Sequence, residues 1–517
     1  MKALIWAFLL MMAASPLMAG AETNAINITA FGATADDTSD DTNSLRLALQ
    51  SDAREIHVPK GTYILRRIRP YIPIRSEKTI ICHPGAIFQV PGDAQVESQK
   101  TRHGYIFQPI FGASIDDPPI NDFSMRGCKF IIEKQGTTPI LIDKENSNRI
   151  SIDGVVVDGK GQTSHNQAAY GILVNNGTSL TIRNTKISYT RGPAIVTRLP
   201  RKCTMENNQI NHAGVDVAYT ANGPEKGKYG VDYWNSAGIS AAGASSCSIT
   251  NNTVNWTGGA GIILRGGSNN CENNRVAFNR LNNIGKGGIG IGINTDGRGS
   301  SLNNVIEGNV ISGYMQRWSD AGINVNHRGQ SGEIRGITIA NNVIDLYGNE
   351  RTRYRFPTHE EFIKTYGGQI IIDPSGTGYA DHIIIRGNIL KNSIGPAITA
   401  KRLRNSEIKN NTICNSSRGL SEGGRLSRLI PARYPIVITE ALNLKVNNNK
   451  IFSKIKPAIK ISAAESEVSN NLVIDCGKVT SGKNNAEFFA IDLQDGVMKN
   501  KVFGNDVRKQ MIGELCP

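Results

Sequence analysis

A six-residue phrase recurs along this chain of 517 residues. It consists of an apolar residue, any residue, Asn or Gly, any two residues and a second apolar residue, as in residues 205–210 and 249–254. The shortest spacings between successive phrases are 22 or 23 residues, and longer spacings indicate a repeat that carries an insertion. A fixed period in this range predicts a solenoid of stacked coils. The third residue of the phrase is Gly127, Gly154, Asn184, Asn207, Asn251, Asn273, Gly308, Asn341, Gly387, Asn410, Asn448, Asn470 and Asn500.

Each repeat has the pattern of one coil with three short strands. In residues 171–190, strands are expected at 171–174, 180–182 and 186–188, and Asn184 lies between the last two. Asn tolerates the left-handed backbone of a tight bend, and Asn side chains stacked at that bend can hydrogen-bond along the stack. The frame is Ile and Val, whereas a leucine-rich repeat of similar period needs a Leu frame. We therefore predict an all-β fold, a parallel β-helix solenoid of about 13 coils.

The first 21 residues have the pattern of a signal peptide. Lys2 precedes an apolar run at residues 3–14, and small residues at 19–21 supply a cleavage site near Ala21. The run is too short to span a bilayer, so we expect a secreted or periplasmic protein with no membrane insertion. The expected organisation is a signal peptide at 1–21, an N-terminal cap with the first coils at 22–110, β-helix repeats at 111–510 and a C-terminal tail at 511–517.

The chain is basic. Its 58 Lys and Arg residues against 44 Asp and Glu residues give a formal net charge of +14, or +13 once Lys2 is removed. A basic surface favours an anionic partner, and export favours an acidic polysaccharide over nucleic acid. The sequence predicts no particular oligomeric state.

All eight Cys residues follow the signal peptide, in a compartment where disulfides persist. They show no CxxC or Cys/His spacing typical of a metal site. Cys203 and Cys247 each lie four residues before a repeat Asn and therefore occupy equivalent positions. If their coils are adjacent, about 4.8 Å separates the two strands, which is within disulfide reach. Two buried free thiols are the alternative.

A short amphipathic segment precedes the repeats. Thr42 is placed to cap a helix in which Leu45, Ala48 and Leu49 form one apolar face. The open end of a β-helix exposes unpaired strand edges. We therefore predict a short N-terminal capping helix that covers this end of the solenoid.

The opening of the chain resembles a known superfamily. The residues that carry the resemblance are Phe-Gly-Ala at 31–33, Asp-Asp-Thr at 40–42 and Val-Pro-Lys-Gly-Thr-Tyr at 58–63, together with the Asn-Asn repeats. They resemble the pectate-lyase-like superfamily of right-handed parallel β-helix proteins, and the likeness covers nearly the whole mature chain. The superfamily includes polysaccharide lyases, polygalacturonase-like hydrolases, uronan epimerases and phage tailspike depolymerases. The resemblance therefore implies a right-handed coil and a carbohydrate polymer as ligand, without fixing the reaction.

The same resemblance places the substrate along the face formed by the first strand of each coil. Four insertions, at 212–236, 312–321, 345–367 and 415–434, all fall between a third strand and the next first strand. Long loops on one side of a rigid scaffold are typical of binding sites. We therefore expect these insertions to border the substrate face.

One outward position of the first strand is polar in almost every coil. It lies four residues after the Gly or Ala that opens the strand, and by alternation its side chain points away from the core. Neighbouring members are expected about 4.8 Å apart. Cations in such a row bind carboxylates, and amides bind sugar hydroxyls. The predicted row is Arg198, Ala242, Arg265, Asn294, Asn326, Asp373 and Lys401.

The predicted reaction is cleavage of an acidic polysaccharide by β-elimination. A cation neutralises the uronate carboxylate, which makes the C5 proton more acidic, and a base removes that proton. Arg328 and Arg265 are the candidates for neutralisation, and His327 and Lys401 are the candidates for the base. The predicted catalytic residues are His327, Arg328, Asp373, Asp320 and Lys401. The predicted substrate-binding residues are Arg265, Asn294, Asp296, Asn324, Asn326, Tyr314 and Trp318.

Two local motifs resemble those of related enzymes but are incomplete. Asn-Thr-Asp-Gly at 294–297 matches the first motif of polygalacturonase-like hydrolases, yet it follows its strand instead of preceding it, and the companion motifs are missing. We interpret this match as a turn. Asp373 and Pro374 resemble the start of the Asp-Pro-His-Asp motif of alginate epimerases, with Ser375 and Gly376 in place of His and the second Asp.

Three alternatives to a lyase stay open. A glycoside hydrolase would use two carboxylates from Asp296, Asp320 and Asp373. A C5-epimerase shares its first step with elimination. A non-catalytic protein for polysaccharide binding or exopolysaccharide assembly fits the lack of a complete catalytic motif. The cofactor is also open: Asp side chains can ligate calcium, but no fixed-spacing calcium loop is present.

Overall fold

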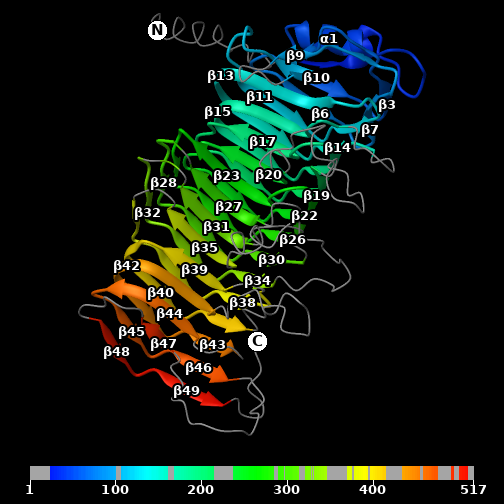
Figure 1. Ribbon diagram of the computed structural model, residues 1–517. Helices are drawn as coiled ribbons and strands as arrows, with labels where there is room; N and C mark the ends of the chain where they lie inside the picture. The colour runs from blue at the N-terminus through cyan, green and yellow to red at the C-terminus, as the bar shows by residue number, and fades with distance from the viewer. Residues whose placement is uncertain are drawn as a thin grey trace, which may run out of the picture.

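The computed structural model is a right-handed parallel β-helix, in which the coils stack in chain order from one end of the molecule to the other (Figure 1). This confirms the predicted all-β solenoid. The strands of the described residues lie in one sheet of 32 strands and one of 15, with a separate pair formed by β4 (Arg67–Ile68) and β8 (Gln95–Val96). The structure describes residues 24–100, 106–160, 168–214, 237–284, 289–295, 297–313, 321–327, 329, 331–345, 369–374, 378–393, 396–414, 434–453, 458–475, 491–493 and 500–509.

The first strand of each coil pairs in parallel with the first strand of the next coil, and we call this array the first sheet. Ile291 faces Ile323 and Ile293 faces Val325 across one such pair. All four side chains are fully buried, and burying one of them contributes roughly 1.5–3 kcal/mol. The first-sheet strands are β10 (Ile106–Ala113), β13 (Thr137–Asp153), β15 (Ile172–Arg183), β17 (Ile195–Arg198), β20 (Ile239–Ala242), β23 (Ile262–Gly267), β27 (Ile289–Thr295), β31 (Ala321–His327), β35 (Ile370–Pro374), β39 (Ile398–Lys401), β42 (Ile436–Asn447), β44 (Ile459–Ala464) and β47 (Ile491–Leu493).

The second strands of successive coils also pair in parallel, and we call this array the second sheet. The long strands β13, β15 and β42 begin in the first sheet and continue without a break into the second. Its strands are β2 (Glu55–Val58), β6 (Thr79–Cys82), β11 (Asn121–Arg126), β18 (Thr204–Glu206), β21 (Ser248–Thr250), β25 (Arg275–Ala277), β29 (Val305–Glu307), β33 (Thr338–Ala340), β37 (Ile384–Arg386), β40 (Leu403–Lys409), β45 (Glu467–Ser469) and β48 (Lys501–Phe503). The central coils carry a fourth, short strand before the second one. These short strands are β24 (Cys271–Glu272), β28 (Ser301–Leu302), β32 (Ile334–Arg335) and β36 (Ala380–Asp381).

The third strand of each coil forms the 15-stranded sheet, which we call the third sheet. Its strands are β3 (Gly61–Ile64), β7 (Ala86–Val90), β12 (Lys129–Ile132), β14 (Val156–Asp158), β16 (Lys186–Thr190), β19 (Gln209–Ala213), β22 (Thr253–Thr257), β26 (Arg280–Ile284), β30 (Val310–Ser312), β34 (Val343–Asp345), β38 (Ile389–Lys391), β41 (Thr412–Cys414), β43 (Lys450–Ser453), β46 (Leu472–Asp475) and β49 (Asp506–Lys509).

A ladder of Asn side chains, buried except at its last member Asn505, runs along the bend between the second and third strands. The backbone N–H and the side-chain amide of Asn309 both donate to Oδ1 of Asn342 in the next coil, at 3.0 and 2.9 Å. The same amide of Asn309 also donates to the carbonyl of Val276 at 2.9 Å. Asn side chains therefore stack at this bend as predicted, but the predicted residue is wrong: the left-handed Asn207 is exposed, and the next residue, Asn208, belongs to the ladder. The ladder comprises Asn208, Asn252, Asn279, Asn309, Asn342, Asn388, Asn411, Asn449, Asn471 and Asn505.

Two of the predicted bend residues belong to a different bend. Asn273 lies between the short strand β24 and the second strand β25, and Phe278, with φ of 57°, takes the bend before the third strand of that coil. Asn500 directly precedes the second strand β48, and Gly504, with φ of 64°, takes the later bend. Both bends need a residue with left-handed backbone between two apolar residues. The repeated six-residue phrase therefore cannot distinguish the two bends.

The predicted capping helix is present as α1 (Thr42–Gln50) at the N-terminal end (Figure 1). Leu45, Ala48 and Leu49 are fully buried, as expected. The assignment of Thr42 as the cap is wrong, because Asp41 occupies the N-cap position and Thr42 is the first helical residue. Among the described residues, no helix is long and apolar enough to cross a membrane.

Two disulfides between described cysteines join neighbouring coils. Cys203 and Cys247 are bonded, with their Cα atoms 4.4 Å apart, so the bridge is the correct alternative for this pair. A second bridge joins Cys82 to Cys128, with a Cα separation of 4.9 Å. Cys271 is a buried free thiol. The predicted signal peptide and the C-terminal tail at 511–517 lie outside the described residues.

Candidate functional site

The register of the first sheet brings the predicted polar residues into one line, which we call the outer row: Arg198, Ala242, Arg265, Asn294, Asn326, Asp373 and Lys401. Each member faces the next across a strand pair from β17 to β35. Because Ile372 pairs with Ala400, Asp373 then faces Lys401. The predicted alignment is therefore confirmed.

The outer row is longer at both ends than the sequence analysis proposed. Asp143 pairs with Asn175, Asn175 pairs with Arg198, and Lys401 pairs with Thr439. The Asn175 amide donates to Oδ1 of Asp143 at 2.5 Å, and both side chains are buried. The rule of four residues after an opening Gly, applied to Gly171, would have found Asn175.

Three Asn side chains form the centre of the site on β27 and β31. Asn294 and Asn326 are each 6% exposed, and Asn324, on the same outward face two residues before Asn326, is 7% exposed. Within the described part of the chain, neither side-chain polar atom of Asn294 has a hydrogen-bond partner, and neither does Oδ1 of Asn324 or of Asn326. A buried polar group without a partner costs about 1–3 kcal/mol. Sugar hydroxyls, which both donate and accept, match these amides.

An ion pair follows the amides along the outer row. Nζ of Lys401 lies 3.8 Å from Oδ1 of Asp373, and the two side chains are 53% and 34% exposed. An exposed pair at this separation contributes little to stability. Because both side chains are partly exposed, a ligand that lies along the row can contact both groups.

Arg265 is too far from this pair to act on the same sugar. It lies four register steps from Lys401, which corresponds to roughly 19 Å at the strand spacing of a sheet. Arg265 remains a predicted substrate-binding residue, but not the partner of a base at Lys401.

His327, a predicted candidate for the base, does not face the outer row. The side chain is buried at 3% exposure, and Nδ1 lies 2.9 Å from Oγ1 of Thr295. Nε2 accepts a hydrogen bond from the N–H of Gly332 at 3.2 Å. His327 directly follows the outward Asn326, so strand alternation already directs it inward.

The remaining predicted site residues and most of the insertions lie outside the described residues. The strands that flank the insertions have the predicted order, since β19 ends at Ala213 and the next first-sheet strand β20 begins at Ile239. The undescribed predicted residues are Asp296, Tyr314, Trp318, Asp320 and Arg328.

Comparisons with known proteins agree with this architecture. Residues 25–224 match the family described as "Rhamnogalacturonase A/epimerase, pectate lyase-like". The chain is similar in structure to the family 28 exopolygalacturonase of Yersinia enterocolitica, with a TM-score of 0.52, 13% identity and coverage of 81% of this chain and 78% of that one. A double-mutant tailspike protein of Escherichia coli bacteriophage HK620 gives a TM-score of 0.51 at 10% identity, covering 92% of this chain and 78% of the tailspike. No curated protein matches the sequence significantly.

Proposed function

We propose that this chain, a right-handed parallel β-helix whose residues 25–224 match a pectate-lyase-like family, is a polysaccharide lyase that cleaves an acidic polymer lying along the outer row. The observation that carries the proposal is the accessible pair of Asp373 and Lys401 beside the amide of Asn294 and Oδ1 of Asn326, which have no hydrogen-bond partner among the described residues. We also propose that the protein acts in the periplasm or outside the cell. The signal-peptide pattern and the two disulfides support an oxidising compartment.

The pair supplies the two groups that β-elimination needs. Lysine is a cation at neutral pH, so Lys401 is assigned to the uronate carboxylate, where its charge favours the carbanion-like transition state. Asp373 accepts the C5 proton. The electrons of the broken C–H bond form the C4–C5 double bond, and the glycosidic oxygen leaves from C4 and takes a proton from solvent.

A hydrolase stays the alternative, since two of its three predicted carboxylates, Asp296 and Asp320, lie outside the described residues. It needs two carboxylates about 5–5.5 Å apart for retention or about 6.5–9.5 Å apart for inversion. Among the described members of the row, the carboxylate other than Asp373 is Asp143, seven register steps or roughly 34 Å away. A C5-epimerase would use the same proton abstraction and is distinguished by its product.

Calcium is not assigned a role in this mechanism. Within the described ranges, no three His, Cys, Asp or Glu side chains converge to hold a metal ion. The proposed reaction therefore includes no step on a metal ion, and the assay compares activity with calcium and with a chelator.

The test is an assay on a panel of acidic polysaccharides that follows the absorbance of unsaturated uronate ends and the number of reducing ends, with calcium and with a chelator. A lyase raises both signals, a hydrolase raises only reducing ends, and an epimerase changes only the uronate composition. Retention on the polymer with no chemical change identifies a binding protein.

Two variants test the site itself. Asp373→Asn and Lys401→Ala are each expected to lower turnover at least 100-fold, the usual range for a lost acid–base group. Lys409→Ala is the matched control, because Lys409 lies 2.6 Å from Glu407 in a similar pair on the second sheet. Wild-type turnover in both row variants would refute the assignment.

A further inference from the structure

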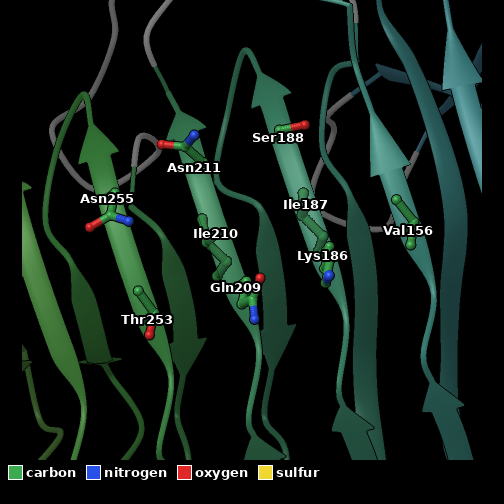
Figure 2. A pocket seen from close by; sticks show the side chains of 9 residues that line it. All are labelled: Val156, Lys186, Ile187, Ser188, Gln209, Ile210, Asn211, Thr253 and Asn255. Carbon is green, nitrogen blue, oxygen red and sulfur yellow. The ribbon is translucent and has the colours of Figure 1, made fainter.

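The third sheet carries a hollow that the proposed reaction does not use. It has a volume of about 330 Å³ and lies over β14, β16, β19 and β22, on a different sheet from the outer row (Figure 1 and Figure 2). Figure 2 shows two lines of outward side chains across these strands. The lines consist of Lys186, Gln209 and Thr253, and of Ser188, Asn211 and Asn255.

The hollow is lined by groups that bind hydroxyls and one that binds carboxylates. Asn255 accepts a hydrogen bond from the amide of Asn282 at 2.9 Å through Oδ1, so this bond does not use its own amide N–H groups. No side-chain hydrogen bond links Asn211 or Gln209 to any other residue in the part of the chain that the structure describes. Lys186 adds a positive charge beside them. Amides, a hydroxyl and a cation together match a hydroxylated, acidic ligand.

A column of stacked rings borders the line of Ser188, Asn211 and Asn255. Tyr189 and His212 are stacked with centroids 5.0 Å apart, and His212 and Trp256 with centroids 6.1 Å apart. All three residues have positive φ, between 55° and 59°. This backbone breaks the strand alternation, so that each ring stands outside the sheet directly after an outward polar residue.

The column ends at an exposed ring. Trp256 is 43% exposed, and the following coil carries Asn283 at the equivalent position. An aromatic surface beside polar groups offers the apolar contact that the C–H faces of a sugar ring require. The polar lines and the column lie on the same three strands, so one ligand reaches both.

We propose that this surface is a second, non-catalytic binding site for the same acidic polysaccharide, in which amides and Lys186 bind the sugar substituents and Trp256 packs against a sugar ring. The class of ligand rests on the proposed function, whereas the site itself rests on the third sheet alone. The residues that line the hollow itself include no carboxylate and no His, so we assign this surface to binding and not to cleavage.

The test uses the full chain and three acidic polymers, polygalacturonate, alginate and hyaluronan, with dextran as a neutral comparison. Retardation in gels that contain each polymer measures affinity. Hydrogen exchange measures which strands the polymer protects. We expect protection of residues 209–213 and 253–257, and about a tenfold loss of affinity in the double variant Trp256→Ala, Asn211→Ala.

Controls separate this site from the outer row and from general damage. Phe278→Ala removes another exposed aromatic, 53% exposed at a bend, and is expected to bind like the wild type. Asp373→Asn is expected to lose turnover while it keeps the protection of 253–257, so failure of the proposed reaction does not obscure the result. Trp256→Phe keeps a ring and is expected to retain most of the affinity.

Three outcomes would overturn the proposal: wild-type affinity in the double variant, protection confined to the first sheet, or no retardation by any of the acidic polymers. Turnover of short oligosaccharides is expected to stay unchanged in the double variant, because the outer row is intact. A loss of both binding and turnover would indicate damage to the fold and would also count against the site.

Discussion

At the scale of single residues, Cys271 shows how burial suppresses a reactive group. Burial raises the pKa of its thiol to about 12, and the thiolate is the reactive form. At pH 8 only about one thiol in ten thousand is then ionised. We predict that iodoacetamide at pH 8 leaves Cys271 unmodified in the native protein and modifies it in guanidinium chloride. Mass spectrometry of the peptide that contains residue 271 measures both, and rapid labelling of the native protein would contradict the prediction.

His212 gives a second prediction at this scale, about pH. Burial between Tyr189 and Trp256 lowers the pKa of His212 below its ordinary value of 6.5. The unfolded chain therefore takes up a proton first as the pH falls, and the stability that the neutral ring contributes is lost below about pH 6.5. We predict that the melting temperature falls more between pH 7.5 and pH 5 in the wild type than in His212→Phe. Equal decreases in the two proteins would refute this role of His212.

At the scale of structural elements, the Asn ladder ties neighbouring coils together. Asn342→Ala removes the acceptor for both the backbone N–H and the amide of Asn309. Each of the two buried donors left without a partner costs about 1–3 kcal/mol, so we predict a loss of about 2–6 kcal/mol in the free energy of unfolding. Urea denaturation followed by circular dichroism measures the change.

The residue before Asn342 provides the control for this prediction. Asn341 is exposed and has φ of 56°, a conformation that Gly adopts without steric cost. Asn341→Gly is expected to change stability by less than about 1 kcal/mol. If Asn341→Gly lowered the free energy of unfolding as much as Asn342→Ala, the conformation of the bend, and not the hydrogen bonds of the ladder, would account for the stabilisation.

The same elements show what sequence can and cannot predict in this fold. The outer row follows from strand alternation alone, and its alignment was predicted correctly from Arg198 to Lys401. Alternation also directs His327 inward, but its proximity to the row in the sequence made it a predicted candidate for the base. Asn273 was placed at the wrong bend because a left-handed Asn serves two bends of one coil. The hollow beside Asn211 could not be predicted from the sequence. Its lining consists of polar residues at outward strand positions, and only the register between the strands shows that they lie together.

At the scale of the whole molecule, the straight stack of coils gives the outer row a defined length. From Arg198 to Lys401 there are six register steps, or roughly 29 Å. One register step is about 4.8 Å, and we assume that one sugar of an extended chain spans one step.

We therefore predict that affinity for acidic oligosaccharides rises with each added sugar up to about seven and then levels off. Calorimetry with size-defined oligosaccharides, in the Trp256→Ala, Asn211→Ala background to remove the third-sheet site, measures this dependence. Lys401→Ala, which shortens the row by one cation, is expected to lower the affinity for a heptasaccharide about tenfold and to change that for a disaccharide less, since a disaccharide can bind elsewhere along the row. An affinity that is already constant from the disaccharide onwards would show that the ligand contacts one end of the row only.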